Sequence, residues 1–341
     1  MRFAVGYQLL EDLDLCFAGI VRDFRESIAE VYFPWLDMAS GRMALTNRRG
    51  FVDWGGQRRV EEDLRAVGRL GVRLNLLLNA NCYGRLGVSR YLSNQVCSLV
   101  DYLGDRVGLD AVTTASPMIA WTVKKSFPEI EVRASVNMRI GTVKAMEYMA
   151  DSFDGFHIQR EYNRDWERIG ELKQWAEAHG KSLCILANSG CLDFCSAQTF
   201  HDNLVAHETE VNEVEAVEEW NPYACQSYFA DRTHWPAFLQ GSWIRPEDLS
   251  RYEGLFSQVK LATRMHANPR MVIKAYADGA FTGSLPDLLE PGHAALFRPY
   301  VIDNTRFPED WFDTVSACDK RCHECTYCAE VLERVLVQAP E

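Results

Sequence analysis

Eleven cysteines dominate the chemistry that this 341-residue sequence could perform. Four of them stand together near the C-terminus, in the run Cys318-Asp-Lys-Arg-Cys322-His-Glu-Cys325-Thr-Tyr-Cys328. Such short gaps let one loop surround a single metal centre, and thiolates prefer soft centres such as zinc or iron–sulfur clusters. Thiols in one run are more typical of ferredoxin-type cluster loops than of zinc sites, which usually combine two separated pairs. We therefore expect a 4Fe-4S cluster here, with zinc as the alternative.

The first three of these thiols also match the C-x3-C-x2-C spacing of radical S-adenosylmethionine enzymes. In those enzymes the triad follows the first barrel strand, whereas here it lies at the far end of the chain. The neighbouring Cys328 would also fill the iron site that the methionine ligand needs. The radical-enzyme interpretation is therefore the weaker alternative.

A second group of thiols is spread along the chain. The run Asn188-Ser-Gly-Cys191-Leu-Asp-Phe-Cys195 directly follows a predicted strand, Cys82 follows another, and Cys225 lies in the next connection. In a barrel of parallel strands, the loops that follow the strands share the C-terminal face, where catalytic loops lie. We expect Cys82, Cys191, Cys195 and Cys225 to gather there around one cluster.

The remaining cysteines receive a structural interpretation. Cys184 lies inside the same strand as Asn188, and four residues at about 3.3 Å each place it roughly 13 Å below the strand end. This depth favours Cys82 over Cys184 as the fourth ligand of the barrel cluster. Cys16 and Cys97 stand among apolar helix positions, which predicts small buried hydrophobic residues.

Charged side chains are expected on the same face of the barrel. Arg160 and Glu161 end one predicted strand, Asn137 ends another, and Lys260 and Arg264 share one face of the last strand. Burying these three cations in a barrel mouth costs several kcal/mol unless neighbouring anions compensate their charges. Glu161 and an anionic substrate or cluster would do so, and a structural Arg160–Glu161 ion pair is the alternative.

Two histidines near the second cysteine run complete the candidate site. His201 and His207 could handle protons, because imidazole titrates near neutral pH. Either could instead support a neighbouring group or lie at the surface. The candidate catalytic residues are Arg160, Glu161, Lys260, Arg264 and His201.

The elements that must position these residues alternate regularly. Helix-like segments at 58–70, from the cap Ser89 onward, at 141–150 and at 164–178 separate short apolar runs. The strand-like runs are 2–9, 30–36, 73–79, 110–116, 131–138, 155–160, 182–188 and 258–264. Such alternation over about 260 residues predicts a parallel sheet. Seven or eight units favour a closed (β/α)8 TIM-like barrel, and no G-x-G-x-x-G turn supports a dinucleotide-binding sheet.

The character of the chain changes after the last predicted strand. Helices are expected at 270–281 and 328–337, with proline-punctuated loops and the cysteine-dense run between them. We therefore expect a barrel over residues 1–290 that carries the active site, and a C-terminal extension over residues 291–341 that carries the four-cysteine motif. The acidic run Glu208–Glu219 is expected to cross a solvated surface.

Composition narrows the classes of function. The chain has 36 Lys and Arg against 48 Asp and Glu, a net charge of −12, which argues against wholesale nucleic-acid binding. No apolar stretch reaches the ~18 residues of a membrane span, and the N-terminus lacks a signal-peptide pattern. We expect a cytoplasmic protein with no membrane partner. In a reducing compartment, clustered cysteines indicate metal or redox ligands, not disulfides.

Several of these runs together resemble the collagenase-like U32 peptidase family. They are Arg160-Glu161, the Asn-Ser-Gly-Cys191 loop with Cys195 and His201, the run from Ile244 to Leu249, and Lys260-x3-Arg264. The similarity runs in order from about Asp110 to Leu289. The motifs are weak singly and moderately specific together.

The resemblance implies a barrel that binds a 4Fe-4S cluster through four cysteines. Cys191, Cys195, Cys225 and one further cysteine would hold the cluster, and a substrate would lie near the charged residues Arg160, Glu161, Lys260 and Arg264. Despite the peptidase name, several members of the family are implicated in oxygen-independent hydroxylation of the ubiquinone ring or of RNA bases.

This chain departs from the family pattern in two places. The family's last strand typically reads Lys-x-Glu-Gly-Arg, and here Ala262 stands at the acidic position between Lys260 and Arg264. The C-terminal four-cysteine run is not part of the core pattern and indicates a second cluster, serving as an electron relay. The acidic charge of the chain also weakens the case for an RNA substrate.

The sequence thus predicts an iron–sulfur oxidoreductase acting on a small anionic or aromatic substrate. An electron-donor protein or a paired homologous subunit would be its partner. A metal-dependent peptidase, as the family name implies, is one alternative, although no H-E-x-x-H or G-x-S-x-G run is present. A cluster-bearing subunit that supports a related barrel without catalysis is the other.

Overall fold

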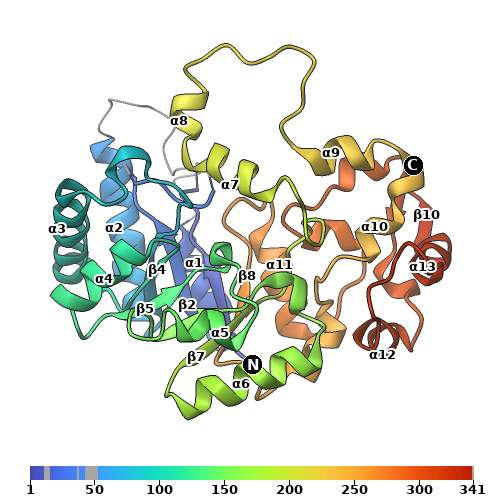
Figure 1. Cartoon of the computed structure of the whole chain (residues 1–341), viewed down its shortest axis with the longest axis horizontal. Coiled ribbons are helices and arrows are strands. Elements are labelled where there is room, and N and C mark those ends of the chain that lie inside the picture. Colours follow the sequence, from blue (N-terminus) through green and yellow to red (C-terminus); the bar gives the residue numbers. More distant parts are fainter. Residues whose placement is uncertain (11–15, 37, 43–52, 340–341) are drawn as a thin grey trace.

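A computed structural model describes residues 1–10, 16–36, 38–42 and 53–339 of the chain. Eight parallel strands follow one another around a closed barrel, and β1 pairs with β8 to complete it (Figure 1). The strands are β1 (Phe3–Gly6), β2 (Ile28–Pro34), β3 (Arg73–Leu78), β4 (Ala111–Thr114), β5 (Glu131–Ala134), β6 (Gly155–His157), β7 (Ser182–Leu186) and β8 (Gln258–Leu261). Each overlaps one predicted strand, so the prediction of a (β/α)8 barrel is confirmed.

Helices surround the barrel and bury their apolar faces on it. Those of the first six units are α1 (Phe17–Asp23), α2 (Trp54–Arg69), α3 (Arg90–Val107), α4 (Pro117–Ser126), α5 (Val143–Glu147) and α6 (Trp166–Ala178). As predicted, the Ser89 hydroxyl caps α3 by accepting the amide of Leu92 at 3.1 Å. The helix ends at Gly108, whose φ of 80° is a left-handed conformation that glycine adopts without strain.

The connection from β7 to β8 is the longest and departs from a simple βα unit. It carries α7 (Gln198–Ala206), α8 (Glu208–Val211), α9 (Ala224–Phe229) and α10 (Pro236–Leu239). Its acidic stretch from 208 to 219 is largely exposed, as expected for a solvated segment. In Figure 1 this yellow segment loops away from the barrel between α8 and α9.

The C-terminal extension packs against one side of the barrel. It follows α11 (Pro269–Asp278) and contains α12 (Trp311–Ser316), α13 (Tyr327–Val335) and an antiparallel pair, β9 (Tyr300–Ile302) and β10 (Leu336–Gln338). Trp311 stacks on Trp243 of the β7–β8 connection, with ring centroids 5.9 Å apart, and both are almost fully buried. Figure 1 shows the extension on the side of the molecule opposite α2, α3 and α4. The division at residue 290 stays a prediction.

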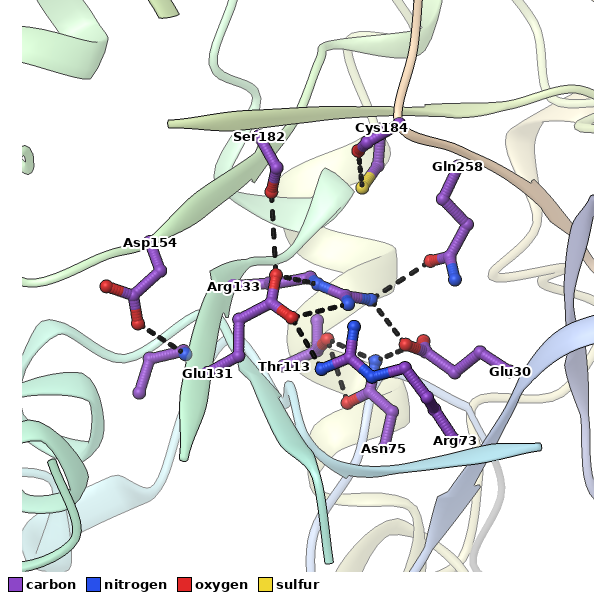
Figure 2. A network of polar contacts seen from close by, with 12 residues as sticks. Glu30, Arg73, Asn75, Thr113, Glu131, Arg133, Asp154, Ser182, Cys184 and Gln258 are labelled. Atoms are coloured by element: carbon purple, nitrogen blue, oxygen red, sulfur yellow. Dashed lines mark hydrogen bonds and ion pairs between the residues drawn. The ribbon is translucent and has the colours of Figure 1, made fainter. Parts of the chain in front are cut away.

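A network of polar side chains lies in the barrel interior, on residues near the N-terminal ends of the strands (Figure 2). Arg133 donates to Glu30 at 2.7 Å and to Gln258 at 3.0 Å, and Asn75 donates to Glu30 at 2.8 Å. The side chains of Arg133 and Glu30 are only 4% and 1% exposed. Such a buried pair is tolerated only where neighbouring hydrogen bonds satisfy both ions. This layer therefore fixes the register of several strands below the face that carries the site.

Two of the cysteines given a structural interpretation are less buried than predicted. Cys16 is exposed, because it precedes α1 as the N-cap residue and does not lie on an apolar helix face. Cys97 lies within α3 but is half-buried, and its thiol is 3.5 Å from the Ser126 hydroxyl. The prediction of small buried hydrophobic residues was wrong for Cys16 and overstated for Cys97.

None of the helices in the described part of the chain combines the length and the apolar character that a bilayer span requires.

Candidate functional site

Several candidate residues were predicted to end strands, but they lie slightly beyond the strand ends. Arg160 and Glu161 form a 3-10 turn after β6, and Asn137 lies in a similar turn after β5. Arg264 comes three residues after the end of β8, so it does not share the strand with Lys260. The predicted strand ends were therefore too late, although all these residues lie at or beyond the C-terminal ends of the strands.

Lys260 and Arg264 are two cations placed inside the barrel mouth. The Lys260 ammonium lies 4.2 Å from the centre of the Tyr32 ring, and burial together with nearby Arg264 and Arg42 lowers its pKa to about 8. One Arg264 nitrogen donates to the Ser40 hydroxyl at 3.1 Å, while Nη2 is buried without a hydrogen-bond partner. Burial lowers the pKa of Arg264 to about 10. Within the described residues, neither cation has a carboxylate at ion-pair distance.

Glu290 is the carboxylate that reaches ion-pair distance from a cation of this region among the described residues, while Glu30 and Glu208 act more weakly on Lys260 and Arg264. Glu290 pairs with Arg42 at 3.2 Å and acts electrostatically on both Lys260 and Arg264. Lys260 and Arg264 therefore have no ion-pair partner among the described residues, and an excess of positive charge away from water is costly. The mouth is thus electrostatically prepared for an anionic ligand.

Arg160 and Glu161 do not form the structural ion pair that was the alternative for them. Glu161 is 1% exposed, and its Oε1 lies 3.7 Å from Arg139 but accepts no hydrogen bond among the described residues. Arg160 instead acts electrostatically on His201 and Asp202. Glu161 therefore keeps an unsatisfied acceptor inside the site, and such an atom calls for a donor.

His201 and Asp202 on α7 bring titratable groups to the same region. The His201 ring meets Tyr223 edge-on at 5.1 Å, and burial and Arg42 lower the pKa of the imidazole. Burial raises the pKa of Asp202, whose carboxylate accepts the Asn81 amide at 3.2 Å. His201 is consequently biased toward the neutral form, which can accept a proton.

Three of the four expected barrel thiols lie within electrostatic range of one another. Cys225, at the start of α9, lies close enough to Cys191 and Cys195 for their charges to raise its pKa, together with burial. Arg42 in turn lies within electrostatic range of Cys191. The Cys191 thiol is thus within electrostatic range of one cation of the mouth.

Cys82, the expected fourth thiol, is engaged differently. Its sulfur accepts the Gly84 amide at 3.3 Å and a hydrogen bond from His207, and these contacts lower the pKa of the thiol. His207 also contacts Glu210, with Nδ1 and Oε2 3.0 Å apart. Its assignment as the fourth cluster ligand stays a prediction.

Cys184, the rejected competitor, lies in the polar layer of the barrel interior (Figure 2). Its thiol acts electrostatically on Arg133 and lies 3.8 Å from the Ser257 hydroxyl. Burial raises its pKa to about 11. This position agrees with the depth that the sequence spacing indicated.

The chemistry of the donor set fits an iron–sulfur cluster, although no ligand shell is preassembled. All eleven cysteines are free. Within the described ranges, no three His, Cys, Asp or Glu side chains are placed to hold a metal ion. The barrel group nonetheless combines free, partly accessible thiols from two segments with neighbouring cations, and cations stabilise the negative charge of a thiolate-bound cluster.

Sequence reasoning missed Arg42, Asp202 and Glu290. Arg42 and Glu290 come from distant loops with no motif around them, and only the closure of the barrel brings them together. Asp202 stands beside His201 in the sequence, so its proximity to the site could have been inferred from that neighbour.

Comparison with known proteins gives one curated relative and several similar structures. The chain is 25% identical to the uncharacterized protease MJ1657 of Methanocaldococcus jannaschii over 93% of its own length and 91% of that protein. The solved structure of the U32 peptidase Mk0906 covers 76% of this chain and 92% of its own, with a TM-score of 0.53 and 15% identity. A chitinase from Rhizomucor miehei covers 82% of this chain and all of its own at a TM-score of only 0.42 and 11% identity. No family model matches the sequence.

The fold defines this chain as a (β/α)8-barrel protein whose mouth carries thiols and buried cations. The whole-length relationship to MJ1657 and the fold shared with Mk0906 together confirm its resemblance to the U32 peptidase family.

Proposed function

We propose that this protein is an iron–sulfur oxidoreductase that acts on a small anionic substrate in the barrel mouth. The observation that carries the proposal is the pair of half-buried Lys260 and buried Arg264, which have no carboxylate at ion-pair distance among the described residues. Both are coupled electrostatically to Arg42, which lies within electrostatic range of the Cys191 thiol. Free thiols close to a cationic mouth are expected for a site that binds a negatively charged cluster and a negatively charged substrate.

The cations would bind and orient the substrate. The free Nη2 of Arg264 supplies a donor for a carboxylate or phosphate oxygen, and Lys260 supplies a second charge below it. An anion bound there would recover several kcal/mol of the cost of burying these charges. The Tyr32 ring under the ammonium keeps Lys260 in place.

The acidic and imidazole groups would handle protons and substrate donors. Glu161 offers its unsatisfied Oε1 to a substrate hydroxyl or amine. His201 can accept a proton because burial and Arg42 favour its neutral form. Asp202 beside it can stabilise the imidazolium that results.

Cys191, Cys195 and Cys225 would hold the cluster, with Cys82 as the fourth ligand. When bound, a 4Fe-4S cluster would supply one-electron redox chemistry. Oxygen-independent hydroxylation is the proposed reaction: a substrate C–H bond and water give C–OH, two protons and two electrons. The electrons would leave singly to a carrier protein. Free thiols suit the reducing cytoplasm that we propose for such an enzyme.

Loss of the barrel thiols tests this proposal. Cys191→Ala and Cys195→Ala should each remove the iron of the barrel centre and its share of the absorbance near ~400 nm. Cys97→Ala is the matched control, because that thiol lies on α3 and its hydrogen-bond partner is the Ser126 hydroxyl. Unchanged iron content in both barrel variants would contradict the assignment.

Hydrolysis is a second candidate function, favoured by one specific arrangement. Cys82, His207 and Glu210 place a thiol, an imidazole and a carboxylate in sequence, which is the order of groups in a cysteine nucleophile site. The relative MJ1657 is also named a protease. Cys82→Ala separates the two functions: loss of iron supports the oxidoreductase, whereas retained iron with loss of peptide cleavage supports the hydrolase.

A further inference from the structure

The four-cysteine loop of the C-terminal extension lies directly against the cysteine loop of the barrel. Lys320, between Cys318 and Cys322, pairs with Asp193, between Cys191 and Cys195, at 3.0 Å. Two runs that are more than a hundred residues apart in the sequence thus meet through the residues between their thiols.

Lys320 makes several contacts that fix this junction. Its ammonium also donates to the Glu161 carbonyl at 2.6 Å and contacts the Ser242 hydroxyl at 3.1 Å. Ser242 in turn donates its hydroxyl to Asp193 at 2.7 Å. The ammonium therefore joins the extension to both the barrel's cysteine loop and the backbone of a candidate catalytic residue.

The backbone of the tail loop directs an amide toward a cysteine sulfur. Lys320 has a φ of 60°, and its amide donates to the Cys318 sulfur at 3.2 Å. Amide hydrogen bonds to sulfur stabilise metal-bound thiolates and tune cluster potentials. Gly84 and Cys82 repeat the same local pattern, with a φ of 53° and a contact of 3.3 Å.

A buried cation lies within electrostatic range of both loops. Arg164 is 7% exposed, donates to the Trp243 carbonyl at 2.6 Å and lies over the Trp243 ring at 4.7 Å. No carboxylate in the described part of the chain reaches ion-pair distance from it. Its charge instead acts on Asp193 and on the Cys328 thiol. The charge of a buried arginine in this position is compensated best by an anionic centre.

We propose that the loop from Cys318 to Cys328 binds a second iron–sulfur centre, docked by Lys320 and Asp193 onto the barrel centre, and that single electrons pass between the two. The existence of the tail centre is independent of the proposed function, whereas the electron transfer rests on it.

The transfer balances without any bond being made or broken. One electron leaves the barrel centre, which is oxidised, and enters the tail centre, which is reduced. The tail centre then returns to its oxidised form by reducing an oxidised one-electron carrier protein. Two such cycles remove the two electrons that hydroxylation of one substrate releases.

Metal content of the full-length chain, purified without oxygen, tests the tail site. We expect about eight irons and eight sulfides per wild-type chain and about four in Cys322→Ser/Cys325→Ser. Cys191→Ser/Cys195→Ser should also retain about four, and these belong to the tail. If the tail variant loses iron and the barrel variant does not, the tail centre is supported and the barrel proposal is refuted. Zinc in the tail, or no change in the tail variant, would overturn this inference.

Magnetic interaction tests the docking. In dithionite-reduced wild-type protein, two neighbouring paramagnetic centres should give a broadened electron paramagnetic resonance spectrum. A spectrum equal to the sum of those from the two double-cysteine variants would overturn the docking, whatever the metal content.

The contribution of Lys320 is tested by Lys320→Met, which should retain about eight irons but show a weaker magnetic interaction. Asp193→Asn should act in the same direction, and Lys320→Arg should restore the interaction. Lys274→Met is the control, because that exposed lysine pairs with Asp278 on α11. An unchanged spectrum in both Lys320→Met and Asp193→Asn would show that this ion pair does not position the centres.

Discussion

Lys260→Met should make the protein more stable at neutral pH. The pKa of Lys260 falls from 10.5 to about 8, mainly because burial disfavours the charged ammonium. At about 1.4 kcal/mol per tenfold change, this difference corresponds to a cost of about 3 kcal/mol. The contact with the Tyr32 ring offsets about 1 kcal/mol. Methionine has nearly the same length and no charge, so we expect a net gain of about 2 kcal/mol.

The gain should depend on pH in a defined direction. Below about pH 8 the ammonium is charged in both the folded and the unfolded chain, so its full cost is present. Between about pH 8 and 10.5 the folded chain releases this proton while the unfolded chain still binds it, and the wild type gains stability. Glu290 and Glu30 oppose this lowering of the pKa, and Arg264 and Arg42 reinforce it. Because the wild type gains stability across this window, the advantage of the variant should shrink there.

Thermal unfolding under oxygen-free conditions measures the effect. At about 2 °C per kcal/mol for a domain of this size, Lys260→Met should unfold about 4 °C higher at pH 7. Lys144→Met, whose side chain is 68% exposed, should change little. Substrate turnover should be lost in Lys260→Met. A less stable variant at pH 7 would show that the chain itself compensates the Lys260 charge, and would refute the anion-binding argument.

Three further substitutions probe the rest of the barrel. Arg133→Met should destabilise the protein by about 3–5 kcal/mol in denaturant titrations, because it leaves the buried Glu30 without its partner. Arg73→Met, at a side chain that is 43% exposed, should cost less than about 1 kcal/mol. Equal losses in the two variants would contradict the buried-pair argument. Cys184→Ala should leave the iron content unchanged, since its thiol lies in the polar layer, and a loss of iron would make it a ligand. Asn188→Ala should cost about 2–3 kcal/mol, because its amide bonds two backbone segments beyond β8; a loss below about 0.5 kcal/mol would contradict this role.

The barrel could be predicted because parallel strands are buried on both sides. In the run 73–78 four of the six residues are leucine, and every residue after Arg73 is buried. Helix α4 was overlooked although Ser116 and Pro117 form a cap and first-turn signature. The helix has only ten residues, so its apolar periodicity extends over too few positions to stand out in the sequence.

The interior polar layer could not be predicted from sequence. Glu30 and Asn75 stand in strands where an alternating pattern would place them toward solvent, and only the closed barrel supplies Arg133 as their common neighbour. The docking of the tail was equally hidden. Lys320 and Asp193 have no sequence relationship, and their contact depends on how the extension packs through Trp311.

The sequence indicated the residue types of the candidate site, but not which side chains these residues contact. Cys191, Cys195 and Cys225 lie within electrostatic range of one another, because residues that follow a barrel strand are confined to one face, and their role as cluster ligands stays a prediction. Cys82 follows β3 on the same side, but its local turn at Gly84 directs the thiol toward His207. Side-chain direction within a loop is not encoded in strand periodicity.

Mössbauer spectroscopy of a variant without tail thiols tests the barrel centre most directly. In a chain carrying Ser at 318, 322, 325 and 328, any bound iron must belong to another site. We predict about four irons and four sulfides per chain, with the spectrum of a 4Fe-4S cluster. A chain that binds no iron after anaerobic reconstitution, or that binds only zinc, would contradict the proposal that thiols in the barrel mouth hold a redox cluster.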